Sequence, residues 1–220
     1  MRHELRVFDD TAALARGAAT YVLEQNQRMT SSASSFSFAV SGGKSPWMML
    51  AELAKESVDW ERTIIYQVDE RVVLEGDDLR NLTHLREGLA STSVQIEAMD
   101  VDDSDLDAAA GRYASILPAR FNLVHLGLGP DGHCASLIPN DQVLEVTDRL
   151  VALSGPYQGT RRMTLTYPAL ARSDQLMWLV SGEDKREALA KLLDGDTSIP
   201  AGNVEARASL IMADRAALGS

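Results

Sequence analysis

The apolar residues of this chain fall into short runs that alternate with longer stretches of helical spacing. Runs with the length and composition of buried strands occur at residues 5–8, 36–40, 64–68, 121–127, 149–153, 162–166, 175–181 and 208–213. Between them, apolar side chains recur on one helical face at residues 11–28, 46–56, 105–117 and 183–193. This alternation predicts an α/β fold in which a mostly parallel, open sheet carries helices on both faces.

The alternation runs along the chain without a boundary between domains. The Ser-rich segment Met29–Ser35 is the nearest thing to a linker, and it is too short to separate two domains. The sequence contains no internal repeat and no low-complexity tract. Because a chain of 220 residues can bury a large core, we expect residues 1–220 to form a single domain.

Composition and charge limit the kinds of molecule that this protein is expected to bind. With 45% hydrophobic and 24% charged residues, the chain has the make-up of a soluble globular protein. Its formal net charge of −11 argues against nucleic acid and anionic membranes as partners, since both require a basic footprint. A small anionic substrate responds to local charge, so it remains compatible with this composition.

The cysteine content and the N-terminus predict the compartment. The one cysteine, Cys134, excludes an internal disulfide and suits a reducing cytoplasm. Residues 1–10 lack the apolar core of a signal peptide, and no stretch approaches the roughly 18 uninterrupted apolar residues of a membrane span. We therefore expect a cytoplasmic protein that is neither exported nor inserted into a membrane.

Four polar clusters each come directly after a predicted strand. In open parallel sheets, ligands bind beyond the carboxyl ends of the strands, and clusters in that position meet at one edge. Unrelated solvated loops would not be expected to follow a predicted strand four times, so the clusters predict one shared site. They are Ser41–Lys44, Asp69–Arg71, Gly129–His133 and Ser181–Lys185.

The cluster at Gly129–His133 carries residues for acid–base chemistry. It follows the apolar run Phe121–Leu126, and three glycines within six positions let the backbone approach a ligand closely. Asp131 and His133, two residues apart on such a turn, can transfer a proton. The alternative interpretation is a tight connection with a solvated Asp and a capping His.

The cluster between the second strand and its helix presents groups that bind anions. Backbone N–H groups at a helix N-terminus, together with the helix dipole, favour a phosphate beside Ser41, Gly42 and Gly43. Pro46 suits the first turn of this helix. Lys44 either adds charge or points to water. The full spacing of a nucleotide P-loop is absent, so an ordinary turn is the alternative.

Cationic side chains accompany the other clusters. In the cluster Asp69–Arg71, Arg71 could grip an oxyanion with the acids orienting it, and a solvated strand end is the alternative. Arg161 and Arg162 start another strand, and we expect one of them to face the site and the other to face solvent. Lys185 begins a helix, an unfavourable place for a cation unless an anion lies nearby.

The sequence does not support several other chemistries. No cluster of His, Cys and Asp has the spacing of a structural zinc site, so we expect no metal and no other cofactor. Asp100–Asp107 contains five Asp, but it is typical of a solvated loop and helix start. Cys134 beside His133 suits a small packed residue better than a ligand or nucleophile. The motif G-x-S-x-G is absent, which disfavours a serine nucleophile.

Five motifs occur in order over nearly the whole chain, from about residue 5 to the terminal A-D-R-A-A-L. They are V-S-G-G-K-S-P, D-E-R-V-V, L-G-L-G-P-D-G-H-C-A-S-L-I-P, R-M-T-L-T-Y-P and L-V-S-G-E-D-K-R-E-A-L. Together they resemble the motifs of the 6-phosphogluconolactonases. The chain departs from the usual pattern of that family at Lys44, at Leu79-Arg80-Asn81 and at Ile138.

The resemblance implies the α/β fold that this family shares with the glucosamine-6-phosphate deaminases. It also implies hydrolysis of 6-phospho-D-glucono-1,5-lactone to 6-phosphogluconate, the second step of the pentose phosphate pathway. A δ-lactone is an activated ester, so a water molecule and a positioned base suffice without a metal, a cofactor or a covalent intermediate. His133 is then the base, assisted by Asp131 or by Asp69.

The charged groups would bind the rest of this substrate. Arg71 or backbone N–H groups would stabilise the oxyanion that forms at the lactone carbonyl. The phosphate would lie against Ser41–Lys44, with Arg162 and Lys185 as side-chain clamps. These cations would supply the local positive field that the acidic chain lacks as a whole.

Two other functions remain open from the sequence. Glucosamine-6-phosphate deaminases resemble D-G-H-I-A-F-N-E-P at the central motif, with a Glu before the proline where this chain has Ile138. The missing carboxylate counts against their ring-opening chemistry. A non-catalytic sugar-phosphate sensor could keep the phosphate loop, but it would have no need for the Asp131–His133 pair and would normally carry an effector domain.

Overall fold

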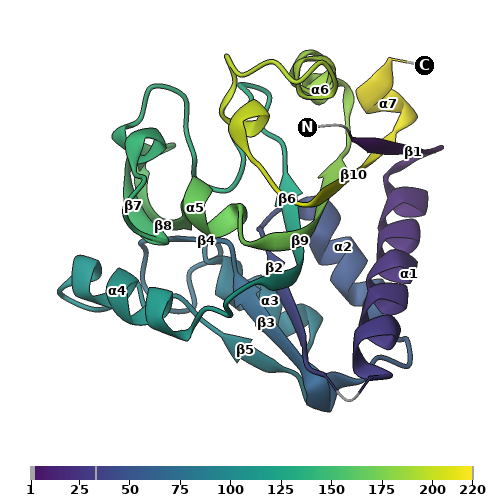
Figure 1. Cartoon of the computed structure of the whole chain (residues 1–220), viewed down its shortest axis with the longest axis horizontal. Coiled ribbons are helices and arrows are strands. Elements are labelled where there is room, and N and C mark those ends of the chain that lie inside the picture. Colours follow the sequence, from purple (N-terminus) through teal and green to yellow (C-terminus); the bar gives the residue numbers. More distant parts are fainter. Residues whose placement is uncertain (1–2, 33, 220) are drawn as a thin grey trace.

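A seven-stranded sheet forms the centre of the structure, a computed structural model that describes residues 3–32 and 34–219. Every neighbouring pair of its strands is parallel, in the order β1-β10-β9-β6-β2-β3-β5 (Figure 1). The strands are β1 (Glu4–Phe8), β2 (Phe36–Val40), β3 (Thr63–Gln67), β5 (Gln95–Glu97), β6 (Phe121–Gly127), β9 (Ser173–Val180) and β10 (Ala208–Asp214). The predicted α/β fold with a mostly parallel sheet is confirmed. Its single-domain organisation stays a prediction.

Helices cover both faces of the sheet, as the alternating pattern predicted. One face carries α1 (Thr11–Thr30), α2 (Lys44–Leu53) and α3 (Asn81–Gly88). The other face carries α4 (Leu106–Ile116), α5 (Tyr167–Leu170), α6 (Arg186–Leu193) and α7 (Arg215–Leu218). Short 3₁₀ helices lie at η1 (Trp60–Arg62), η2 (Gln142–Glu145), η3 (Glu183–Lys185) and η4 (Pro200–Asn203).

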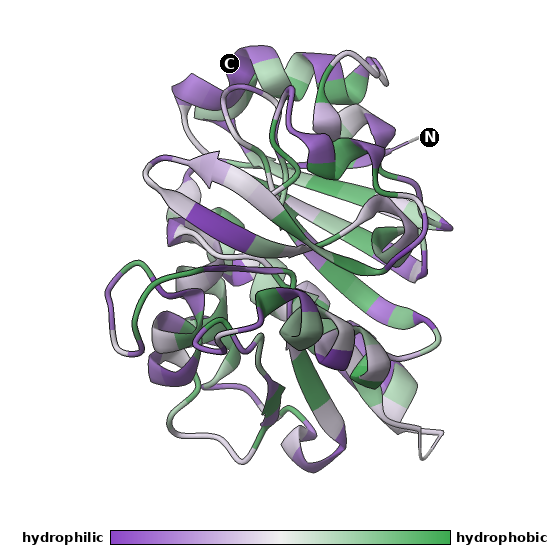
Figure 2. Ribbon diagram, turned by 90° about the vertical axis from the view of Figure 1, so that its left-hand side faces the viewer, coloured by the Kyte–Doolittle hydropathy of each residue, from purple (hydrophilic) through white to green (hydrophobic). Residues whose placement is uncertain are grey.

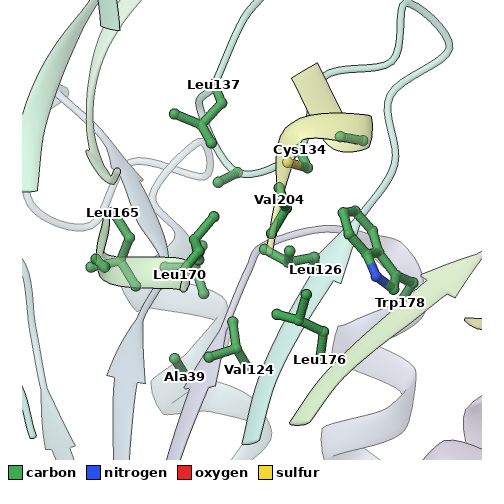
Figure 3. Packing of buried hydrophobic residues seen from close by; sticks show 14 of the residues in the cluster. Ala39, Val124, Leu126, Cys134, Leu137, Leu165, Leu170, Leu176, Trp178 and Val204 are labelled. Atoms are coloured by element: carbon green, nitrogen blue, oxygen red, sulfur yellow. The ribbon is translucent and has the colours of Figure 1, made fainter. Parts of the chain in front are cut away.

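Side chains alternate between two hydrophobic cores along each central strand, since successive residues of a strand point to opposite faces. In β2, Phe36 and Phe38 stack with ring centroids 6.0 Å apart in the core beneath α1 and α2, whereas Ala39 belongs to the opposite core. Figure 3 shows that second core, where Trp178 of β9 is fully buried. Apolar strands therefore lie inside, between helices of mixed polarity (Figure 2).

Three local predictions were wrong or incomplete. The helix expected at 46–56 is α2, which begins at Lys44 because Gly43, with φ +138°, turns the chain directly into it. α3 was missed because it is mostly polar; its first N–H groups are held by Glu70, which accepts from Asn81 and Leu82 at 2.8 Å. The strand β5 was also missed, since three residues give too short a pattern.

A second, three-stranded antiparallel sheet was not predicted. It has the order β4-β8-β7 and comprises β4 (Asp69–Arg71), β8 (Thr160–Leu165) and β7 (Val151–Tyr157). The runs expected at 149–153 and 162–166 are its β7–β8 hairpin. Their turn is tight because Gln158 and Gly159 both have positive φ, 51° and 86°. Val68 joins the two sheets: its N–H donates to Val40 at 3.0 Å and its carbonyl accepts from Leu165 at 2.8 Å.

The strand order reverses direction between β2 and β6. From β2 the chain proceeds through β3 to β5 on one side, and from β6 through β9 to β10 on the other. In an open α/β sheet, the loops after two such strands leave toward opposite faces and open a crevice at their carboxyl ends. The segments that follow β2 and β6 are Ser41–Lys44 and the Gly129–His133 turn, so the topology itself locates the site.

Candidate active site

A cavity of about 560 Å³ lies at this crevice, and residues from all four predicted polar clusters line it. The clusters contribute Ser41–Lys44, Asp69 with Arg71, Gly129 with His133, and Ser181, Gly182 and Lys185. All four clusters meet there because each follows a strand of the parallel sheet, namely β2, β3, β6 or β9. Asp69–Arg71, which follows β3, also forms the strand β4 and pairs with β8 of the small antiparallel sheet.

The Gly129–His133 turn holds an imidazole against a carboxylate. His133 Nδ1 lies 2.5 Å from Asp131 Oδ1, which also accepts the backbone N–H of His133 at 3.2 Å. Gly129 permits this contact, because a Cβ added there would lie 2.1 Å from His133 Nδ1. Gly132, with φ +81°, could not carry a Cβ either, since it would lie 2.5 Å from Ile199. The two glycines therefore serve close packing as well as the turn.

The electrostatics of the pair favour one protonation pattern. Burial by itself would raise the pKa of Asp131, but hydrogen bonds from His133 and Tyr157 hold that pKa below its ordinary value. Asp131 is therefore ionised at neutral pH and accepts a hydrogen bond from His133 Nδ1–H. That tautomer leaves Nε2 unprotonated and able to accept a proton.

Asp69 occupies a different place in the site. Its carboxylate is buried and accepts hydrogen bonds from the hydroxyls of Ser41, at 3.1 Å, and Ser136, at 2.7 Å. Of the two carboxylates considered as assistants to His133, Asp131 is the one in contact with it. Asp69 instead ties the Ser41 loop to the segment that follows His133.

The alternative of a solvated strand end at Asp69–Arg71 is wrong. Glu70 is fully buried, and its oxygens accept the backbone N–H groups of Arg71, Asn81 and Leu82. The acids do not orient the Arg71 guanidinium, as we expected them to. Arg71 Nη1 instead donates to the carbonyl of Leu79 at 2.7 Å, because Glu70 is directed toward the start of α3.

Arg71 and Arg162 concentrate positive charge at the cavity. They are opposite each other in the antiparallel pairing of β4 with β8, and both line the cavity. The pKa of Arg162 is lowered by burial first and by the neighbouring Arg71 as well, with Asp69 acting in the opposite direction. Arg161 is exposed, which confirms that one member of the tandem faces the site and the other faces solvent. Arg161 and Arg162 both lie near the start of β8, as expected.

The protein does not satisfy every donor of these two guanidinium groups. The Nε atoms of Arg71 and Arg162 are buried and have no hydrogen-bond partner within residues 3–32 and 34–219. An unpaired buried donor is costly, and a buried cation without an anion is more so. An anionic ligand in the cavity would supply the missing acceptors.

The Ser41–Lys44 segment has the geometry expected of an anion-binding loop. It enters α2, a helix of ten residues whose N-terminus faces the cavity. Gly42 lies so close to Asn81 that an added Cβ would be 1.9 Å from its Oδ1. The Ser41 N–H donates to Nδ1 of the buried His125 at 3.3 Å, which fixes the start of the loop. The Lys44 side chain is exposed at the cavity rim.

The last cluster depends on an aspartate that the sequence analysis did not single out. Asp214, at the end of β10, accepts the hydroxyls of Thr11, at 3.1 Å, and Ser181, at 2.5 Å, and the N–H of Gly182 at 3.1 Å. Burial would raise the pKa of Asp214, but these hydrogen bonds lower it. An Asp between a strand and a helix was the available signal. Lys185 lies nearby at the start of α6, paired with Asp184 at 2.9 Å.

His125, Tyr157 and Gln158 were also missed as residues of the site. Gln158 lines the cavity from the tip of the β7–β8 hairpin. His125 looked like part of an apolar strand, and its burial lowers its pKa to about 3, so it is neutral at neutral pH. The sequence signal for the hairpin residues was the turn Y-Q-G-T, whose place at the site depends on the second sheet.

Cys134 and the acidic stretch Asp100–Asp107 have the structural roles that the sequence indicated. Cys134 is buried, and burial raises the pKa of its thiol, so it is a packed residue and not a thiolate nucleophile. The acidic stretch Asp100–Asp107 is the expected solvated loop and helix start, with four of its five Asp exposed and Asp105 capping α4; within it, Asp102 pairs with the buried Arg80 at 3.0 Å and Asp103 pairs with Arg112. In the described part of the chain, no three His, Cys, Asp or Glu residues are grouped as metal ligands.

None of the helices in the described residues combines the length and the apolar composition that a transmembrane helix needs.

Fold and cavity together define a class of protein. Between β2 and β6, where the strand order of the parallel sheet reverses, a His–Asp pair lies beside a helix N-terminus and several cationic side chains. This arrangement suits acid–base chemistry on a small anionic molecule. The family described as glucosamine-6-phosphate isomerases/6-phosphogluconolactonase matches residues 9–212. The chain belongs to this family.

Curated proteins and solved structures agree with that assignment. The chain is 32% identical to the 6-phosphogluconolactonase of Streptomyces coelicolor, over 97% of this chain and 93% of the relative. It is also 32% identical to the 6-phosphogluconolactonase of Mycobacterium tuberculosis, over 98% and 97%. The structure of a 6-phosphogluconolactonase from Shewanella baltica superposes with a TM-score of 0.86 at 26% identity, over 97% and 98%. A monomeric glucosamine-6-phosphate deaminase shares the fold, with a TM-score of 0.86 at 16% identity.

Proposed function

We propose that this protein hydrolyses 6-phospho-D-glucono-1,5-lactone to 6-phosphogluconate in the cytoplasm, as part of the pentose phosphate pathway. Relatives named for this activity match nearly the whole chain at 32% identity. The observation that carries the proposal is that His133, which is paired with Asp131, lines one cavity together with four cationic side chains. The cations are Lys44, Arg71, Arg162 and Lys185.

His133 acts as the general base in this reaction. Its Nε2 takes a proton from a water molecule as the water oxygen adds to the lactone carbonyl carbon. The carbonyl oxygen becomes an oxyanion in the resulting tetrahedral intermediate. When the carbonyl re-forms, the bond to the ring oxygen breaks, and the imidazolium returns its proton to that oxygen. Asp131 keeps the imidazole in the required tautomer and stabilises its charged form, which lasts only between the two transfers.

The phosphate and the oxyanion are bound by different groups. We assign the phosphate to the Ser41–Lys44 loop, with Lys185 and Arg162 as clamps, because a helix N-terminus and several cations meet there. Arg71 stabilises the oxyanion from the neighbouring strand β4. Its unpartnered Nε and its place beside Asp69 support this role, because a preorganised donor needs no rearrangement during the reaction.

The deaminase alternative has no residue that supports it. The position before Pro139, where the deaminase motif has a Glu, is Ile138, and it is buried. A carboxylate is therefore missing from the place where that chemistry needs one. The family shares its fold with deaminases, so the fold alone does not decide between the two reactions.

A coupled assay tests the proposal. Glucose-6-phosphate dehydrogenase generates the lactone in situ, and 6-phosphogluconate dehydrogenase reports the product as NADPH. With this protein present, 6-phosphogluconate should form well above the rate of spontaneous hydrolysis. Ammonia release from glucosamine 6-phosphate is measured in parallel. A lactone rate equal to the spontaneous one, or ammonia release as the main activity, would contradict the proposal.

A further inference from the structure

The hydroxyl of Tyr157 extends the His133–Asp131 pair to a chain of three groups. Tyr157 is the last residue of β7, and its hydroxyl donates to Asp131 Oδ2 at 3.0 Å. The other carboxylate oxygen, Oδ1, lies 2.5 Å from His133 Nδ1. Each oxygen of Asp131 therefore has its own side-chain donor, and the carboxylate is held from both sides.

The ring of Tyr157 also packs against two residues of the site. It meets the imidazole of His133 edge to face, with centroids 5.2 Å apart and an interplanar angle of 66°. The guanidinium of Arg162 lies 5.0 Å from the centroid of the Tyr157 ring. The hairpin turn at Gln158 and Gly159, both with positive φ, places the tyrosine there. The ring thus restrains the imidazole plane, and the hydroxyl restrains the carboxylate.

The protonation states make the hydroxyl of Tyr157 a permanent donor at neutral pH. Burial raises the pKa of Tyr157, and the hydrogen bond to Asp131 and its charge raise it further, with Arg162 acting in the opposite direction. The carboxylate shares its negative charge among the Tyr157 hydroxyl, the His133 imidazole and the His133 backbone N–H. Because it is shared, less of that charge is available to stabilise a protonated His133.

We propose that Tyr157 is a positioning residue for the proton transfer, acting on His133 through Asp131. The Tyr157 hydroxyl holds the Asp131 carboxylate, which sets the imidazole tautomer. Its hydrogen bond also reduces the negative charge that Asp131 directs at the imidazole. His133 is consequently aligned, with Nδ1 toward Asp131, for the proton transfer at Nε2. This inference rests on the proposed function, because the group that benefits is the proposed general base.

The test compares Tyr157→Phe with Tyr167→Phe. The first variant keeps the ring against His133 and Arg162 and removes only the hydroxyl. The control also removes a single tyrosine hydroxyl, which donates to the carbonyl of Pro200 at 2.9 Å outside the cavity. In Tyr157→Phe, kcat should fall roughly tenfold, in line with the loss of a hydrogen bond to a charged group. KM should stay within about twofold. The acid limb of the kcat/KM profile should move to higher pH, and Tyr167→Phe should match the wild type.

A measurement without substrate separates this inference from the proposed function. The imidazole resonances of His133 are followed by NMR as a function of pH, and their midpoint should rise in Tyr157→Phe but not in Tyr167→Phe. An inactive wild type would contradict the proposed function, while the titration would still test the contact. Unchanged kcat and an unchanged midpoint in Tyr157→Phe would overturn the inference. A higher KM with unchanged kcat would overturn it as well, because it would assign Tyr157 to substrate binding.

Discussion

Arg71 of β4 and Arg162 of β8 lie opposite each other, and each has a buried guanidinium Nε without a partner in the described residues. The two like charges repel each other, and the Asp69 carboxylate partly offsets this repulsion at Arg162. The arrangement is favourable once an anion lies between the two groups. Anion binding and protein stability should therefore be coupled in a way that depends on this pair.

Arg162→Met should uncouple stability from anion binding. The variant removes a buried cation but keeps a long side chain, so its melting temperature in phosphate-free buffer should match or exceed that of the wild type. The stabilisation that inorganic phosphate gives the wild type should be mostly lost, and KM should rise by roughly 10–100-fold. Arg161→Met is the matched control, since Arg161 is exposed. A phosphate effect retained in full by Arg162→Met would exclude Arg162 from the anion site.

Lys185→Ala should weaken substrate binding without slowing the chemical step. The phosphate contact of a clamp is made equally in the ground state and in the transition state, so KM should rise while kcat changes little. Initial rates over a range of lactone concentrations measure both constants. Lys191→Ala serves as the control, because Lys191 pairs with Glu187 on α6 outside the cavity. A fall in kcat at unchanged KM would argue against a role of Lys185 as a clamp.

His133→Ala should lower kcat by about 10²–10⁴, the usual contribution of a positioned general base. The fold should be retained, because the side chain lies on a turn at the edge of the sheet. The wild-type rate should fall at low pH as the imidazole takes up a proton, and the variant should lose this dependence. Rates from pH 5 to 8, with circular dichroism as a check of folding, measure both effects. A folded variant with near-normal kcat would exclude His133 as the base.

Asp214→Asn should destabilise the protein at neutral pH and change its response to acid. The carboxylate accepts from Thr11, Ser181 and Gly182, and an amide cannot accept all of these hydrogen bonds, so a loss of roughly 1–3 kcal/mol is expected. The pKa of Asp214 is lowered in the folded protein. Its contribution is therefore full above the unfolded pKa of about 4 and disappears as the pH falls through the folded value.

Urea unfolding at pH 7 and near pH 3 measures this effect. The free energy of unfolding should differ between the wild type and Asp214→Asn at pH 7, and the difference should shrink at the lower pH. A difference that stays constant with pH would show that the charge of Asp214 does not contribute.

Activity should survive removal of divalent ions. The proposed mechanism uses water, a base and cationic side chains, and no step requires a Lewis acid. The protein is dialysed against a chelator and assayed with the coupling enzymes kept supplied with their own ions. Loss of activity that returns on adding a divalent ion to this protein alone would contradict the mechanism.

Local sequence pattern was enough to predict six of the seven strands of the central sheet and the edge at which the site lies. The strands β2 and β6 are short and strongly apolar, and each is followed by an abrupt change to glycine and polar residues, so local pattern suffices to locate them. Parallel strands bring their carboxyl ends together whatever their order, which is why the four clusters Ser41–Lys44, Asp69–Arg71, Gly129–His133 and Ser181–Lys185 could be assigned to one site. The Asp131–His133 contact is local too, because the two residues share one turn.

The distant residues that complete the site are brought there by tertiary contacts. The pairing of β4 with β8 sets Arg71 opposite Arg162, and the β7–β8 hairpin brings Tyr157 to Asp131. Such contacts depend on how the small antiparallel sheet packs on the large one. No periodicity within a single segment contains that information, because it follows from burial of apolar surface shared by both sheets.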